Sequence, residues 1–181
     1  MRVCRAVLVA AWVLCSAVAR AEEAPRRGLG LGVTLSTVVP SSGRARTVFG
    51  DAWTSVRFGP LSTSAPDRWR FDWDVAVLDN RRVGEALLVP LTFGATRGFG
   101  GSRGVRPFVA VRGGPFYGEV KADALGVRRT AIGADLNVSA GVVLADRFVL
   151  EVRYDWVSSF GRHNLSGMTL SAGVKLFTLR L

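Results

Sequence analysis

Cysteine, histidine and long apolar runs are scarce in this chain of 181 residues. Both cysteines, Cys4 and Cys15, lie near the N-terminus, and His163 is the only histidine. The remainder of the chain therefore cannot form a disulfide, a thiolate metal site or a zinc site with several histidines. No later segment approaches the length of a membrane-spanning helix, which needs about 20 apolar residues. We expect no metal site.

The N-terminal residues have the pattern of a secretory signal peptide. Arg2 and Arg5 precede an apolar stretch at 6–14, and small residues allow cleavage after Ala19 or Ala21. We expect a cleaved signal peptide at 1–21, a short N-terminal segment at 22–27 and one domain at 28–181. The exported chain keeps a net charge of about +7. Nucleic acid is not an expected partner, because export removes the chain from the cytoplasm.

Apolar and polar side chains alternate strictly between Arg68 and Val77, which is the signature of a β-strand. The apolar face is large and aromatic, while the other face carries charges of both signs. The same pattern predicts eight strands, at about 28–39, 51–58, 68–77, 87–93, from 106, 135–142, 148–156 and 169–176. Loops are predicted at 40–50, 79–85, 94–104 and 121–129, with a tight turn at Ala145–Arg147. Pro90 suggests a bulge in the fourth strand.

Two architectures accommodate such strands. A transmembrane β-barrel turns its apolar face to lipid and its polar face to a small lumen, and it must close, because lipid cannot satisfy open strand edges. A soluble, lipocalin-like periplasmic barrel would turn the apolar face inward. We favour an all-β, closed, antiparallel eight-stranded transmembrane barrel, whose lumen is just wide enough for side chains to fill. Its predicted lumen set balances five cations against five acids: Arg57, Arg70, Asp72, Asp74, Arg112, Asp135, Glu151, Arg153, Asp155 and Lys175.

Four segments, at 106–114, 137–144, 146–154 and 169–176, resemble the small eight-stranded outer-membrane barrels, the OmpA/OmpX-like group. The resemblance covers about 28–181. It implies a bacterial outer-membrane location, recognition by the outer-membrane assembly machinery, no cofactor and no shared catalytic residue. Members of this group have structural, adhesive or stress-related surface roles. Such barrels usually end in an aromatic residue, whereas this chain ends in Leu181, with Phe177 nearby. The pattern leaves the oligomeric state open.

Basic residues occur in every loop predicted to face the outside. Arginine binds phosphate and carboxylate groups in a bidentate manner, so these loops are candidates for contact with lipopolysaccharide. Simple solvated loops are the competing interpretation. The candidates are Arg44, Arg46, Arg81, Arg82, Arg128, Arg129 and Arg162. Candidates for aromatic residues at the membrane interface are Trp69, Trp73, Tyr154 and Trp156.

An outer-membrane hydrolase acting on lipid A is a weaker alternative. Some lipid A deacylases place a His and a Ser two residues apart near a late strand. Here His163 and Ser166 are three apart, and period two would direct them to opposite faces. Glu151 or Asp155 would have to orient the histidine, although both are expected in the lumen. We therefore expect a non-enzymatic protein.

Overall fold

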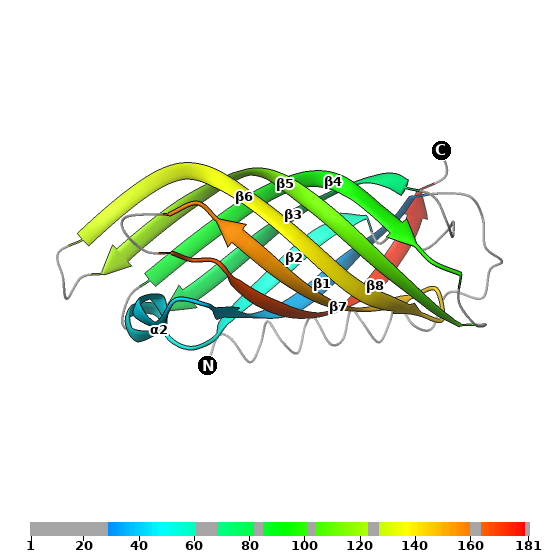
Figure 1. Ribbon diagram of the computed structural model, residues 1–181, viewed down its shortest axis with the longest axis horizontal. Coiled ribbons are helices and arrows are strands. Elements are labelled where there is room, and N and C mark those ends of the chain that lie inside the picture. The colour runs from blue at the N-terminus through cyan, green and yellow to red at the C-terminus, as the bar shows by residue number, and fades with distance from the viewer. Residues whose placement is uncertain are drawn as a thin grey trace.

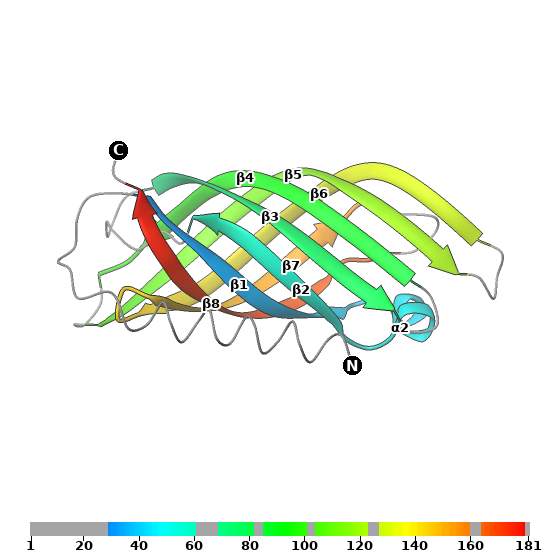
Figure 2. The same ribbon diagram turned by 180° about the vertical axis from the view of Figure 1, so that it is seen from behind.

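The computed structural model describes residues 29–60, 69–81, 85–100, 104–122, 127–159 and 164–179. These residues form a closed antiparallel barrel, in which each strand pairs with the next and β8 pairs with β1 (Figure 1, Figure 2). The strands are β1 (Leu29–Pro40), β2 (Trp53–Pro60), β3 (Trp69–Arg81), β4 (Glu85–Gly98), β5 (Val105–Ala122), β6 (Val127–Leu144), β7 (Phe148–Val157) and β8 (Gly167–Leu179). The predicted fold class is confirmed. None of the described helices has the length and apolar character needed to cross a membrane.

The two ends of the barrel differ. One end carries the short helix α2 (Gly43–Phe49) between β1 and β2, and we refer to it as the helix end. The other carries the tight turn between β6 and β7, and we refer to it as the turn end. In that turn Arg147 N donates to Leu144 O over 3.0 Å, and Ala145 and Asp146 both have positive φ. β1 starts and β8 finishes at the turn end, as an even strand number requires.

Helix α2 lies in a segment that the sequence predicts to be a loop, and that prediction is wrong. The Ser42 side chain caps the first turn by accepting from Ala45 N, and Gly50, whose φ is 90°, caps the helix after its last residue, Phe49. Ala45 and Phe49 are four residues apart and completely buried. Their shared face packs into the barrel interior beside Trp53, and this burial holds so short a helix in place.

Several strands extend farther than the alternation predicts. The predicted loop at 121–129 belongs mostly to β5 and β6, which pair along their full length from Val105–Leu144 to Ala122–Val127. β4 also continues to Gly98, and β3 continues to Arg81. The predicted bulge at Pro90 is wrong. The ladder is interrupted beside the proline and resumes in the same register against both β3 and β5.

Candidate functional site

The interior of the barrel is divided into three layers. An apolar layer fills the helix end, where Phe49, Trp53 and Phe116 are almost wholly buried among smaller apolar side chains. A smaller apolar cluster of Phe108, Val143 and Val149 fills the turn end. Charged side chains lie between these two layers. Trp53, at the start of β2, points into the barrel and is buried.

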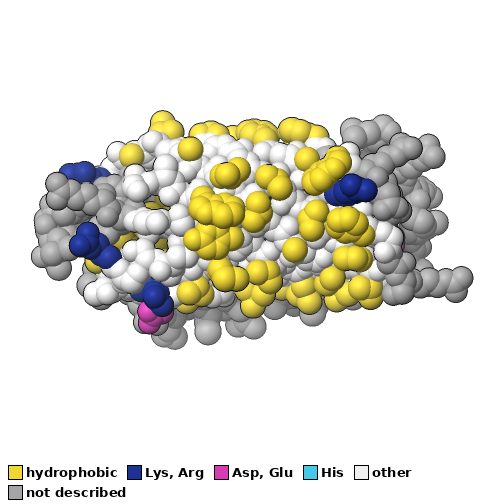
Figure 3. Space-filling view, in the orientation of Figure 1, with side chains coloured by type: hydrophobic (Ala, Val, Ile, Leu, Met, Phe, Trp, Pro, Cys, Tyr) yellow, Lys and Arg dark blue, Asp and Glu magenta, His cyan; other side chains and the backbone are white. Residues whose placement is uncertain are grey.

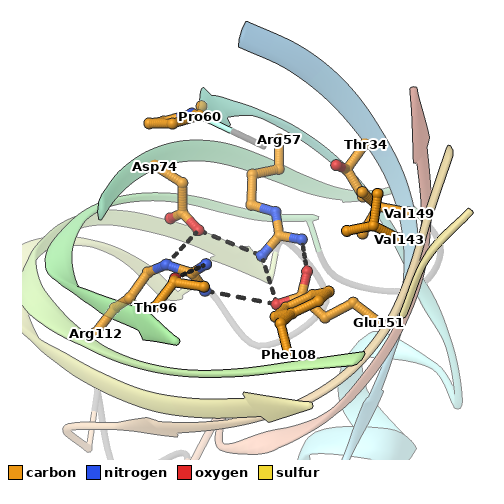
Figure 4. A pocket seen from close by; sticks show the side chains of 11 residues that line it. Thr34, Arg57, Pro60, Asp74, Thr96, Phe108, Arg112, Val143, Val149 and Glu151 are labelled. Atoms are coloured by element: carbon orange, nitrogen blue, oxygen red, sulfur yellow. Dashed lines mark hydrogen bonds and ion pairs between the residues drawn. The ribbon is translucent and has the colours of Figure 1, made fainter. Parts of the chain in front are cut away.

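Arg57 is at the centre of the charged layer (Figure 4). Its guanidinium donates two hydrogen bonds to Glu151, one of them over 3.3 Å to Oε1, and a third over 3.3 Å to Asp74 Oδ2. Glu151 is only 2% exposed. Charges in a low-dielectric interior are costly unless they are paired and hydrogen-bonded, and this geometry meets that requirement.

Two more arginines complete the layer. Arg112 Nη1 lies 3.5 Å from Glu151 Oε1, and Arg153 Nη1 donates to Asp74 Oδ2 over 3.4 Å. Arg153 also pairs with Asp155, its neighbour two residues along β7. Hydroxyl groups provide further hydrogen bonds to these carboxylates. Thr92 donates to Asp74 Oδ1 over 2.6 Å, and Thr169 donates to Asp155 Oδ2 over 2.9 Å.

Not every predicted lumen residue joins this network. Asp135 is buried two residues from Asn137 on the inward face of β6. Lys175 is only partly buried and lies near the turn end, where its backbone N–H donates to Arg147 O over 2.8 Å. Lys175 therefore lies away from the central charged layer, because parity gives the face of a strand but not the height along the barrel. The side chains of Arg70 and Asp72 are outside the described part. Among described side chains, three arginines and four carboxylates are buried.

A cavity of about 20 Å³ lies between the charged layer and the turn-end cluster. Arg57, Asp74, Arg112 and Glu151 line one side, and Phe108 and the two valines line the other (Figure 4). That volume holds about one water molecule. A cavity of this size has no room for an organic ligand.

The outer surface has the opposite character. Large apolar side chains on all eight strands are exposed and form an apolar band on the outer surface, of which Figure 3 shows one face. Phe71 is 71% exposed, Leu170 65% and Val152 46%, whereas Glu151 and Arg153, the charged neighbours of Val152 on β7, are buried. A lipocalin-like barrel would show the reverse distribution. Exposed apolar area of this extent indicates contact with lipid or protein rather than with water.

Comparison with solved structures gives the same architecture. The chain aligns with Neisserial surface protein A at a TM-score of 0.63 and 20% identity, over 83% of this chain and 97% of the other. The N-terminal β-barrel domain of Pseudomonas aeruginosa OprF aligns at 0.51 and 13% identity, over 82% and 98%. The chain has the fold of a small outer-membrane β-barrel. The outer membrane enzyme PagL also aligns, at 0.50 and 15% identity, over 81% and 99%. No family model and no curated protein matches the sequence.

The aromatic candidates lie at different heights of the barrel. Trp69 begins β3 at the turn end and is exposed. Tyr154 and Trp156 lie toward the helix end with ring centroids 4.7 Å apart, and the Tyr154 hydroxyl is 3.2 Å from Ser41 Oγ. Trp73 lies beside Asp74, at the height of the charged layer, and its ring contacts Phe58. Three of the four therefore lie toward an end of the apolar band, and Trp73 does not.

Basic side chains gather at the helix end. Arg44 and Arg46 are exposed on α2, and Arg128 and Arg129 are exposed at the start of β6. Arg128 and Lys121 each lie 3.3 Å from Glu119, and the hydrogen bond from Lys121 lowers the pKa of that carboxyl group, which lies beyond the apolar band. The Arg81 side chain, Arg82 and Arg162 are outside the described part. The alternation of apolar and polar residues, which identifies strands, could not reveal α2. The sequence indicates this helix only by the four-residue spacing of the apolar residues Ala45 and Phe49.

The hydrolase alternative depends on His163, which is also outside the described residues. Ser166 is buried, and its hydroxyl both accepts from Val157 N and donates to Val157 O. Its own N–H donates to the Asn164 side chain. These bonds fix Ser166 as a structural link between β7 and β8. Glu151 and Asp155 are both occupied by arginines in the charged layer. Among the described residues no cluster of His, Cys, Asp or Glu could hold a metal ion.

Proposed function

We propose that this protein is exported through a cleaved signal peptide and spans the bacterial outer membrane as a filled, non-enzymatic barrel with a structural or surface-interaction role. The inverted distribution of side chains carries this proposal, because Glu151 is enclosed by protein while Phe71 and Leu170 are exposed. Water would solvate the first group well and the other two poorly, so the arrangement is favourable only when lipid surrounds the barrel.

The helix end faces outward in this proposal. Outer-membrane barrels have short periplasmic turns and longer extracellular connections. The connection at 41–52, which carries α2, is the longest between two strands and lies at the helix end, and the longest described strands, β5 and β6, extend at that same end. The assembly machinery would recognise β8, in which Phe177 is exposed near the chain end.

A role in contacting lipopolysaccharide follows from this orientation. Arg44, Arg46, Arg128 and Arg129 would lie at the height of the outer-leaflet head groups, which are rich in phosphate. Guanidinium groups bind phosphate through paired hydrogen bonds. All four side chains are exposed, and only Arg128 contacts an acid in the described residues. Replacing both arginine pairs by serine should weaken binding of lipopolysaccharide micelles and flatten its dependence on salt. Unchanged affinity would exclude this contact.

Membrane insertion is tested by extraction and gel mobility. We expect the protein to stay in the outer-membrane fraction after washing with salt or alkali and to need detergent for release. An unboiled sample in SDS should run as a compact band and shift on boiling, because a closed ladder resists unfolding. A protein that stays monomeric in plain buffer would contradict the proposal.

A further inference from the structure

The β5–β6 hairpin projects beyond the rest of the barrel at the helix end (Figure 1, Figure 2). β6 pairs with β5 along its whole length, but it pairs with β7 only from Leu144–Phe148 to Asp135–Val157. One further residue closes that ladder. Ser158 N donates to Ala134 O over 2.9 Å, and the Ser158 side chain accepts from Ala134 N over 3.0 Å. Within the described residues, nothing past Ser158 pairs with this edge of β6.

The orientation of the edge groups follows from that last pair. Both backbone groups of Ala134 point toward β7, and strand geometry repeats this direction at every second residue. The N–H and C=O groups of Ile132 and Thr130 therefore point to the open edge. Pro115, which lacks an N–H, lies opposite Ala134 on β5. Its position agrees with the backbone groups of Ala134 pointing away from β5 and toward β7. An edge with several unpaired backbone groups is a template for another strand.

The side chains around the edge define what kind of strand fits it. Ile132 is 80% exposed, the highest value among the large apolar residues described. The Arg128 side chain is 75% exposed, and Arg129 is exposed as well. Between residues 119 and 129 the hairpin carries three cations, Lys121 and these two arginines, against two acids, Glu119 and Asp123. A second copy of this chain would bring two cationic hairpins together, so an acidic partner is favoured.

We propose that the open edge of β6 at residues 128–133 binds an extended acidic segment of a partner protein by strand addition. Main-chain hydrogen bonds to Thr130 and Ile132 supply affinity, and the arginines select acidic residues. This inference uses the outward orientation proposed above, but the pairing itself can be measured on the purified barrel in detergent.

The test uses the full exported chain refolded in detergent and a fluorescent, amidated peptide of alternating Glu and Val. Thr130→Pro removes the edge N–H without removing a bond to β5, so the barrel should keep its heat-dependent gel shift. Binding should weaken by about tenfold. Thr130→Val is the matched control and should bind like the unchanged protein. An N-methylated peptide and a Lys-Val peptide should bind poorly.

Three results would overturn the inference: no binding of the acidic peptide, equal binding by Thr130→Pro, or equal binding of the N-methylated peptide. The last two results would show that the peptide binds through charge alone. Lipopolysaccharide micelles are expected to bind through charge, so Thr130→Pro should not change their affinity. Loss of the gel shift in the unchanged protein would instead contradict the membrane-barrel proposal. The two failures are therefore distinguishable.

Discussion

Arg57 on β2 and Glu151 on β7 form a two-point ion pair across the barrel interior, although their strands are not neighbours in the sheet. The pair joins opposite walls of the barrel and is enclosed by apolar side chains above and below. Both partners also contact other members of the charged layer. The network thus fills the lumen and fixes the relative position of strands that the hydrogen-bond ladder does not connect directly.

Removing one partner of this pair should be strongly destabilising. Arg57→Met leaves Glu151 and Asp74 buried with fewer hydrogen bonds, and we expect a loss of about 3 kcal/mol in the free energy of unfolding. Urea unfolding in detergent, followed by tryptophan fluorescence, measures it. Arg128→Met, at an exposed position, should change stability by less than about 0.5 kcal/mol. Similar small effects at both positions would show that the buried pair is not intact.

A charge on the outer face should be costly in the middle of the apolar band. Val152 lies between Glu151 and Arg153 in sequence and therefore at the height of the charged layer. Val152→Arg should lose about 2–4 kcal/mol in lipid, whereas Thr130→Arg, beyond the end of β7, should lose no more than about 1 kcal/mol. Folding into lipid vesicles at increasing urea measures both. Equal tolerance at the two positions would argue against a membrane-embedded band.

Helix α2 should stabilise the barrel without acting as a gate. Phe49→Ala removes a wholly buried ring from the helix-end layer and should cost about 3–5 kcal/mol. Planar-bilayer recordings should nevertheless show no conductance, because the charged layer still fills the lumen. Thr47→Ala, on the exposed side of the same helix, is the control. Single-channel openings in Phe49→Ala would indicate that α2 alone seals the barrel.

The turn-end hairpin contains a residue that glycine should improve. Ala145 has a φ of 48°, a left-handed conformation that costs an L-residue with a Cβ. Ala145→Gly should raise the free energy of unfolding by about 0.5–1 kcal/mol. Ala140→Gly, in the regular part of β6, should lower it by a similar amount. A stability loss in both variants would mean that the turn is not in this conformation.

Alternation predicted the fold because each strand has one apolar and one polar face along its central part. It did not predict the strand ends, where the two faces no longer differ in polarity. Around Lys121 and Arg128 both faces carry polar or small residues beyond the apolar band, so a ladder of continuous pairs looks like a loop in the sequence. The signal for these ends lies in backbone pairing, which composition does not record.

The charged layer was only partly predictable for a related reason. The alternation of side chains along a strand correctly assigns Arg57, Asp74 and Glu151 to the face opposite the lipid. It does not give their height in the barrel, because the strands are tilted and residues at different distances from their strand ends lie at the same height. Lys175 has the right parity and yet lies near the turn end. Helix α2 was missed because its signal is only a Ser42 cap and two apolar residues four apart. That signal is shorter than the windows that identify helices.

Lipid exposure of named positions tests the central claim most directly. The exported chain is expected to contain no cysteine, so Phe71→Cys, Val152→Cys and Leu170→Cys can each carry a single fluorescent label in bilayers. Phospholipids with brominated acyl chains should quench all three labels strongly and should leave a label at Thr169→Cys, beside Asp155, almost unaffected. Quenching at Thr169 with none at Phe71, Val152 and Leu170 would contradict the orientation on which the proposed function depends.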